Sequence, residues 1–208
     1  MDPAGSGRIA TVTAALLAGG ASSRLGRDKS RVELDGVASS TRIARLLAGL
    51  FDEVMLVGGD PPADAPGRRV RDVEGPRCGL RGLVSALDAA GGERVLVVAT
   101  DLPLVTADLL LALVAWPEAD AVVPRTADGS HSLCALYRRD SVLPVARARL
   151  AAGVLELRGL LGAIDTRFLD EAEMERLDPG RHALANFNTP DDLARVESLI
   201  AGTHEGSP

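Results

Sequence analysis

Residues 16–30 read L-L-A-G-G-A-S-S-R-L-G-R-D-K-S. An apolar run ends here and a glycine pair, Gly19 and Gly20, follows it directly. Glycines after a strand let the backbone come close to a ligand, and their N–H groups can face an anion. Arg24 and Lys29 add positive charge to the same loop. The stretch therefore predicts a phosphate-binding loop at the end of a buried strand.

This loop differs from the two commonest phosphate-binding motifs. A Walker loop needs Gly-Lys-Ser/Thr in direct succession, but Arg27 and Asp28 separate Gly26 from Lys29. The G-x-G-x-x-G spacing of a Rossmann dinucleotide fingerprint is also missing. A P-loop GTPase or kinase is therefore excluded. The plainest alternative to a phosphate loop is a glycine-rich surface turn with solvated charges.

The composition is that of an ordinary globular protein, with 208 residues, 46% hydrophobic and 25% charged. We expect one domain over 1–208, with a core of about 9–202 and loose ends at 1–8 and 203–208. Aromatic residues make up only 2%, so the core is expected to consist of Leu, Val and Ala. The net charge of −6 argues against a general nucleic-acid binder but is compatible with a nucleotide substrate.

The two cysteines, Cys78 and Cys134, are far apart and belong to no C-x-x-C motif. No signal peptide indicates an oxidising compartment, so we expect free thiols and a cytoplasmic protein. No apolar run approaches the roughly 20 residues that a membrane span needs. The expected partners therefore include neither a membrane nor a nucleic acid.

Strand-like apolar runs alternate with helical patterns along the chain. This alternation predicts an α/β fold, a three-layer α/β/α domain with a mostly parallel, Rossmann-like sheet. Thr106 is expected to cap one helix, and Pro190 to open another. The predicted strands are 10–17, 54–58, 68–72, 94–99, 120–124, 132–137 and 165–169. The predicted helices are 40–50, 79–90, 106–116, 139–151, 156–162 and 190–201.

Ligands of such sheets gather at the carboxyl ends of the strands. Asp101 stands there, directly after the predicted strand 94–99. A carboxylate in this place can hold Mg²⁺, a hard cation that prefers carboxylate oxygens and substrate phosphates. The alternative is a turn aspartate that caps the next helix. Because the glycine loop leaves the sheet at the same edge, we expect Asp101 and Lys29 to belong to one site.

The pattern L-x-G-G-x-S-x-R-x-G-x-D-K over 17–29 resembles the signature of the sugar-nucleotide-type nucleotidyltransferases. Within them it is most similar to the molybdenum cofactor guanylyltransferase family. The D-x-P at 101–103 and the N-x-N-T-P-x-D-L at 186–193 resemble the same family and come in the same order. The resemblance runs from about residue 14 to residue 196, and it is weak over 141–170.

The resemblance implies a nucleotide-diphospho-sugar transferase fold and transfer of GMP from GTP to the terminal phosphate of molybdopterin or molybdenum cofactor. The products would be the guanine dinucleotide cofactor and pyrophosphate. It implies Mg²⁺ on Asp101, and a molybdoenzyme or cofactor chaperone as a further partner. The implied catalytic residues are Arg24, Lys29 and Asp101. The implied substrate contacts are Leu17, Ala18, Gly19, Gly20, Lys29, Asp72, Gly75, Gly79, Asn186 and Asn188.

The chain departs from the family pattern in a few places. Gly58 and Gly59 stand in a region where the guanylyltransferases often carry an Asn that recognises the nucleotide. This departure leaves open a cytidylyltransferase, or a transferase with another small phosphate acceptor. A non-catalytic GTP- or cofactor-binding module is a further alternative. Arg77 and Cys78 replace small or apolar residues, and Ser132 replaces a proline in H-S-L-C-A-L-Y, over 131–137.

The groups that would bind the pterin are not evident from the sequence. A pterin phosphate needs a cation, so the arginines around the weakly matching region are candidates. His131 is as compatible with a surface turn as with a ligand contact. The candidate arginines are Arg138, Arg139, Arg147, Arg149, Arg158 and Arg167.

Overall fold

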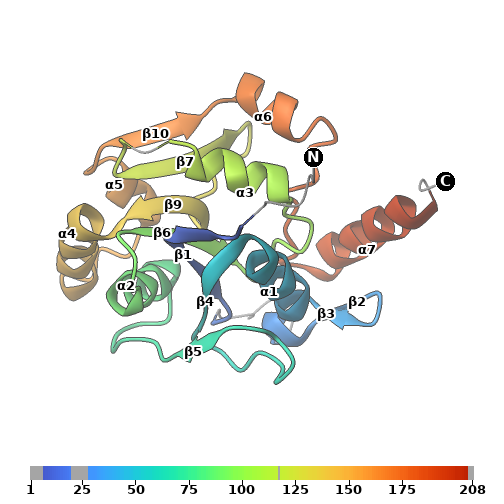
Figure 1. The fold of residues 1–208 in the computed structure, drawn as a ribbon, viewed down its shortest axis with the longest axis horizontal. Coiled ribbons are helices and arrows are strands. Elements are labelled where there is room, and N and C mark those ends of the chain that lie inside the picture. Colours follow the sequence, from blue (N-terminus) through green and yellow to red (C-terminus); the bar gives the residue numbers. More distant parts are fainter. Residues whose placement is uncertain (1–6, 20–27, 117, 206–208) are drawn as a thin grey trace.

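The computed structural model describes residues 7–19, 28–116 and 118–205. A central sheet with the strand order β10-β7-β9-β6-β1-β4-β5 lies between two layers of helices (Figure 1). The strands are β1 (Ile9–Leu17), β2 (Glu33–Leu34), β3 (Val37–Ala38), β4 (Phe51–Val57), β5 (Arg68–Val70), β6 (Arg94–Ala99), β7 (Ala121–Thr126), β8 (Gly129–Ser130), β9 (Cys134–Arg138) and β10 (Thr166–Leu169).

Most neighbouring strands of the sheet run parallel, as the alternating pattern predicts. The pairs β5–β4, β4–β1, β1–β6 and β7–β10 are parallel. Within this sheet, only β9, between β6 and β7, and the short β8 on β7 pair antiparallel among the described strands. The strands β2 and β3 form a separate antiparallel pair. As a result, β9 begins at the edge where the parallel strands end, and its first residues lie beside the end of β6.

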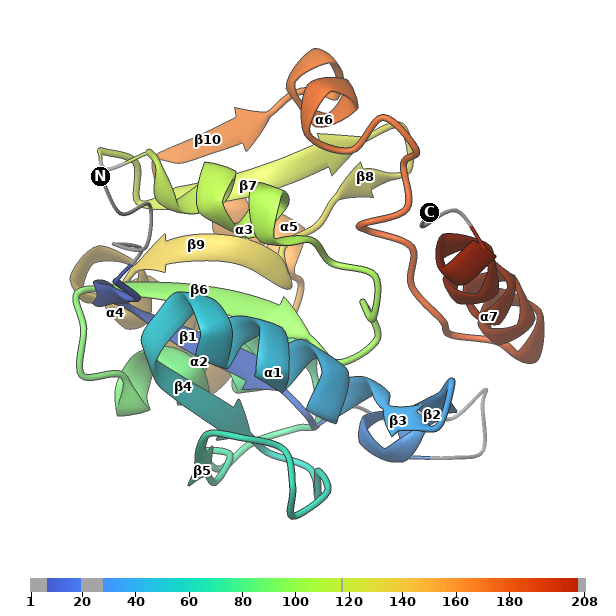
Figure 2. The same cartoon turned by 45° about the vertical axis from the view of Figure 1, so that its right-hand side comes forward.

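Helices cover both faces of the sheet (Figure 2). On one face, α1, α3 and α6 pack on the sheet, and on the other α2, α4 and α5 do so. The helices are η1 (Lys29–Arg31, a 3₁₀ turn), α1 (Ser39–Leu50), α2 (Gly79–Ala89), α3 (Ala107–Val114), α4 (Arg139–Ala151), α5 (Leu157–Leu161), α6 (Glu171–Leu177) and α7 (Pro190–Glu205).

Strand β6 explains why two layers are needed. Its Leu96 and Val98 pack with α1 and α3, whereas Val95 and Val97 pack with α2 and α4. Successive side chains of a strand point to opposite faces, so an apolar run such as V-L-V-V is stable only when both faces are covered. The predicted three-layer α/β/α fold is therefore confirmed.

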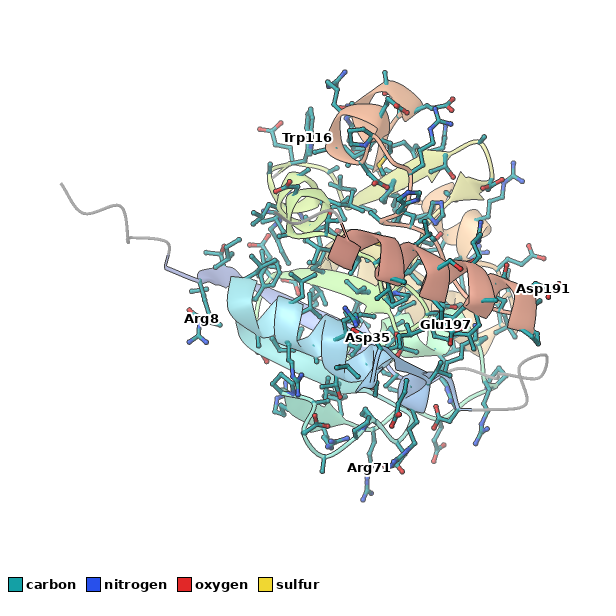
Figure 3. All side chains as sticks on the ribbon, turned by 90° about the vertical axis from the view of Figure 1, so that its right-hand side faces the viewer. Arg8, Asp35, Arg71, Trp116, Asp191 and Glu197 are labelled. Atoms are coloured by element: carbon teal, nitrogen blue, oxygen red, sulfur yellow. The ribbon has the colours of Figure 1, made fainter. Side chains whose placement is uncertain are left out.

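The C-terminal helix α7 is not part of either layer. It lies against η1 and the hairpin of β2 and β3, beyond the carboxyl ends of the central strands (Figure 2). Figure 3 places Glu197 of α7 and Asp35 of the hairpin turn on the same side of the molecule. A small separate core joins these segments, and it consists of Val32, Leu34, Phe187, Val196 and Ile200.

The predicted cap residues have the expected roles. Thr106 accepts a hydrogen bond from Leu109 N at 3.3 Å, and Pro190 is the first residue of α7. That helix continues to Glu205 instead of ending at 201, and Gly202 does not interrupt it. Thr203 to Glu205, the start of the expected loose end, are therefore helical.

Some short elements were absent from the sequence-based prediction. The two-residue strands are too short to show alternation, and η1 is a single turn. Helix α6 did leave a signal, since Asp170 and Glu173 form a capping box at its start. Strand β4 begins at Phe51, three residues earlier than predicted, because it follows α1 without a loop.

Both cysteines are free, as predicted. Complete burial raises the pKa of the Cys134 thiol to about 12, so this thiol is a packing group rather than a nucleophile. No helix in the described parts of the chain has the length and apolar character that crossing a membrane requires.

Candidate active site

The carboxyl edge of the sheet collects most of the residues predicted from the sequence. Leu17, Ala18 and Gly19 leave β1 there, and Asp101 follows β6. Asn186 and Asn188 reach the same edge from the far end of the chain, because Phe187 N donates to the Asp101 carbonyl at 3.3 Å. Gly20 and Arg24 lie outside the described residues.

Lys29 is at the centre of this group. Its ammonium donates to Asp101 Oδ2 at 2.9 Å and to Asn188 Oδ1 at 2.5 Å. It also stands 5.9 Å from the centre of the Phe187 ring. The Lys29 side chain is 13% exposed and that of Asp101 22%. The predicted meeting of lysine, aspartate and Asn-x-Asn turn is therefore present, and it is largely enclosed.

Serines at the start of α1 hold the two segments that meet here. Ser39 Oγ donates to the Thr100 carbonyl at 2.6 Å, and Ser40 Oγ donates to the Ser30 carbonyl. Both serines are fully buried. They tie the Lys29 turn and the Asp101 turn to one helix end, a role that the sequence analysis missed. Their partners, Thr100 and Ser30, are 61 and 10 residues away, so no local motif indicates this role.

Asp28 fixes the turn that carries Lys29. Its Oδ1 accepts from Ser30 N at 3.0 Å and from Ser30 Oγ at 2.8 Å, and so caps η1. Lys29 is the single lysine among the 23 Lys and Arg residues of the chain. The one ammonium side chain of the protein therefore lies at this site, and an ammonium is a more compact cation than a guanidinium.

The pair Gly58-Gly59 is explained by packing against the glycine loop. Both residues have a positive φ, +66° and +59°. A Cβ on Gly59 would lie 2.3 Å from the Ala18 carbonyl oxygen, and one on Gly58 would lie 2.6 Å from Asp72 Oδ2. No side chain fits at either position, so an asparagine in its usual family place would need a different backbone here.

Asp72 is held beside these glycines by α2. Arg81 donates to Asp72 Oδ2 at 2.7 Å and to the Gly75 carbonyl at 3.2 Å. Both side chains of the ion pair are 18% exposed. Ser85 Oγ lies 3.4 Å from Asp72 Oδ1 and accepts from Val73 N at 2.9 Å. Arg81 was not predicted, because nothing in the sequence shows that it faces the strand-end loop.

The remaining predicted contacts of this side are packing positions in the structure. The Leu17 carbonyl accepts from Thr100 N at 3.2 Å, and Ala18 N donates to the Val57 carbonyl at 2.9 Å. A Cβ on Gly79 would lie 3.0 Å from a Leu133 methyl group and 3.1 Å from one of Leu157. Leu17 and Ala18 are thus held by backbone hydrogen bonds, and Gly79 by the close packing of leucine side chains.

A cavity of about 950 Å³ opens on the other side of Asp101. The guanidinium of Arg125 stacks on the Phe168 ring, 3.5 Å from its centre, and both line this cavity together with Arg158. Burial lowers the pKa of the lining His131, which accordingly is uncharged at neutral pH. The cations of the cavity are therefore its two arginines, which have no acidic partner among the described residues.

Of the six arginines predicted as pterin-binding candidates, Arg158 alone lines this cavity. Three of the others pair with nearby carboxylates: Arg139 with Asp140, Arg147 with Asp88, and Arg167 with Glu173. Arg149 donates to the Glu156 carbonyl at 3.3 Å, and Arg138 does not line the cavity. Arg125 and Phe168 were missed because they are 43 residues apart and meet only through the pairing of β7 and β10.

The site suits a magnesium ion that is shared with a substrate. Within the described ranges no three His, Cys, Asp or Glu side chains are close enough to form a metal-binding group. Asp101 is a carboxylate at the edge of an open cavity, which Asp128 also lines. Mg²⁺ is commonly held by one or two carboxylates, several waters and substrate phosphates, which this donor set fits.

Solved structures of related proteins share this fold. Molybdopterin-guanine dinucleotide biosynthesis protein A from Archaeoglobus fulgidus superimposes with a TM-score of 0.80 at 22% identity, covering 91% of this chain and 99% of that one. The 2-C-methyl-D-erythritol 4-phosphate cytidylyltransferase from Thermus thermophilus superimposes with a TM-score of 0.66 at 17% identity, over 91% of this chain and 98% of that one. The fold therefore occurs with different nucleotides.

Sequence comparison shows to which family of nucleotidyltransferases the chain is most similar. The chain is 34% identical over 198 residues to a probable molybdenum cofactor guanylyltransferase from Chloroflexus aggregans, covering 91% of this chain and 95% of the relative. It is 30% identical over 191 residues to the molybdenum cofactor guanylyltransferase of Rhodobacter capsulatus, covering 89% and 94%. Residues 14–169 match the MobA-like NTP transferase domain. The chain therefore belongs to this family of nucleotidyltransferases.

Proposed function

We propose that this protein is a molybdenum cofactor guanylyltransferase. It transfers GMP from GTP to the terminal phosphate of molybdopterin or of the molybdenum-loaded cofactor, and it releases pyrophosphate. The observation that carries the proposal is the Lys29–Asp101 pair, 2.9 Å apart, beside a cavity with two arginines that have no acidic partner in the described parts of the chain. GTP would lie on the glycine side of this pair, and the acceptor in the cavity.

In this reaction the protein has two tasks, which are to position the two substrates and to neutralise the charge of their phosphates. An oxygen of the acceptor phosphate forms a bond to the α-phosphorus, and the bond from that phosphorus to the bridging oxygen breaks, with its electrons leaving on pyrophosphate. The nucleophile is already an anion, so no general base is needed. Lys29 neutralises phosphate charge, which is the main source of rate in phosphoryl-type transfer. Asp101 would hold Mg²⁺, which would supply positive charge to stabilise the negative charge of the phosphates.

The cavity supplies the groups that an anionic heteroaromatic acceptor requires. A flat ring can stack near Phe168, and Arg125 and Arg158 can bind a phosphate or another anionic group. Arg125→Met should raise the KM for the acceptor by about tenfold, the scale of one charged hydrogen bond, with little effect on the KM for GTP. The matched control is Arg176→Met, because Arg176 is exposed and does not line the cavity.

The proposal is tested by measuring pyrophosphate release from each of the four nucleoside triphosphates. Each assay contains Mg²⁺ and is run with and without molybdopterin. Acceptor-dependent release from GTP alone is the expected result. Release from CTP would assign the protein to cytidylyl transfer, which the glycines at 58 and 59 keep open. GTP binding without release would instead favour a non-catalytic binding module.

Because both cysteines are free, we further propose that the enzyme works in the cytoplasm and passes its product to a molybdoenzyme or cofactor chaperone.

A further inference from the structure

The ammonium of Lys29 has three N–H donors, and two of them are already engaged. One donates to Asp101, after β6, and the other to Asn188, before α7. The donors of an ammonium are arranged tetrahedrally, so two fixed acceptors on separate segments determine where the third N–H points. With either acceptor missing, the flexible lysine side chain could turn about the remaining bond.

Asn188 is itself held firmly by the first turn of α7. Its backbone N–H donates to Asp192 Oδ2 at 3.0 Å, and Thr189 N donates to the same oxygen at 3.0 Å. Asp192 N in turn donates to Thr189 Oγ1 at 3.2 Å. On the other side, buried Phe187 ties the turn to the Asp101 carbonyl. The backbone that carries the Asn188 side-chain amide is therefore fixed on both sides.

The segment that carries Lys29 and the helix that follows Asn188 also share a core. Val32 and Leu34, just after the Lys29 turn, pack with Val196 and Ile200 of α7. This cluster is separate from the two cores of the sheet. The position of the lysine relative to Asn188 is therefore set by this local packing.

We infer that Asn188 is a positioning residue, which acts on the reaction through Lys29 and not by binding the acceptor. The turn before α7 holds the ammonium so that its third N–H, which has no partner among the described residues, faces the phosphates. This inference rests on the proposed function, in which Lys29 neutralises phosphate charge. It changes the role implied by the family resemblance, which treats Asn188 as a substrate contact.

A double-mutant cycle on kcat tests the inference in the transfer reaction. Asn188→Ala should lower kcat by about 10- to 100-fold, the cost of a misplaced catalytic group, while the KM for the acceptor stays within about twofold. In a Lys29→Ala background the same change should cost no more than about twofold, because its target is gone. Losses that multiply in the double variant, or a large rise in the acceptor KM, would overturn the inference.

The single lysine permits a second test that needs neither nucleotide nor acceptor. Acetylation by acetic anhydride, followed by peptide mass spectrometry, reports the accessibility of Lys29 directly. Asn188→Ala should speed the labelling of Lys29, whereas Asn188→Asp, which keeps an acceptor oxygen, should leave it slow. Asn186→Ala is the control within the same turn, since that side chain lines the cavity and no contact joins it to Lys29.

The two tests separate the possible failures. Equal labelling in the wild type and in Asn188→Ala would show that Asn188 does not hold the lysine, and would overturn the inference with the proposed function intact. A wild-type protein without transfer activity would overturn the proposed function. The labelling rates would then still decide whether Asn188 holds Lys29. Circular dichroism of each variant checks that the overall helix content is unchanged.

Discussion

A lysine and an arginine carry the same charge, but a compact ammonium and a planar guanidinium differ in their hydrogen-bond geometry. The ammonium of Lys29 fits between Asp101, Asn188 and the Phe187 ring. Lys29→Ala should therefore lower kcat by roughly two decades or more, the effect of losing one oxyanion-type donor. Lys29→Arg should not restore turnover, because a planar guanidinium cannot replace a compact ammonium in this gap. Near-normal kcat in either variant, measured by pyrophosphate release, would refute the role of this residue.

Gly59 allows the loop after β4 to pack closely against the backbone of the glycine loop after β1. Gly59→Ala would combine a positive φ with a Cβ 2.3 Å from the Ala18 carbonyl oxygen. We expect it to destabilise the fold by more than the approximately 1–3 kcal/mol of backbone strain alone. Gly36→Ala is the matched control, since Gly36 has φ +70° but nothing within 4 Å of the added carbon. Urea unfolding of both variants measures the difference, and equal losses would contradict the clash.

At the scale of elements, the regular pattern of a segment decides how well the sequence predicts it. The long buried strands and the amphipathic helices were predicted nearly to their bounds, because their period persists over many residues. The two-residue strands β2, β3 and β8 have no period to detect. The order of strands, including the antiparallel insertion of β9, depends on contacts between distant segments.

The same distinction applies to the site. Lys29, Asp101 and Asn188 could be predicted from local motifs, because each stands at the end of a recognisable element. Arg81, Ser39 and Ser40 could not, since their partners are 9 to 61 residues away and carry no motif of their own. Tertiary packing alone brings them to the carboxyl edge.

The first turn of α7 makes the stability of this element depend on pH. Hydrogen bonds from the backbone of Asn188 and from the Thr189 side chain and backbone lower the pKa of Asp192 below its ordinary value of 3.8. A lowered pKa in the folded state stabilises the protein above the ordinary value, and this contribution is lost as the pH falls through the lowered value. Asp192→Asn should therefore cost stability at pH 7 and progressively less in acid.

Unfolding of the wild type and of Asp192→Asn in urea, from pH 7 down to about pH 2, measures this effect. Asp191→Asn is the control, because Asp191 is an exposed neighbour in the same turn and holds no backbone N–H of the Asn-x-Asn turn. A stability difference between wild type and Asp192→Asn that stayed constant with pH would contradict the assignment.

At the scale of the whole molecule, the proposed ligands would connect segments from both ends of the chain. The nucleotide side is built from β1, β4 and β6, and the acceptor side from β7, β9, β10 and the turn before α7. Binding of nucleotide with Mg²⁺ to the folded state alone must raise the unfolding temperature. At 100 times its Kd a ligand contributes about 2.7 kcal/mol. For a chain of this size that corresponds to about 5–10 °C.

If Asp101 holds the metal, this stabilisation should require both the carboxylate and the ion. Thermal unfolding of the wild type with GTP should show the shift with Mg²⁺ and lose most of it in EDTA. Asp101→Asn should show little shift in either condition, although it also loses the ion pair with Lys29 and so begins from a lower melting temperature. The comparison therefore uses the shift within each variant. A full Mg²⁺-dependent shift in Asp101→Asn would mean that the ion is held by the nucleotide without this carboxylate, and the metal role of Asp101 would have to be abandoned.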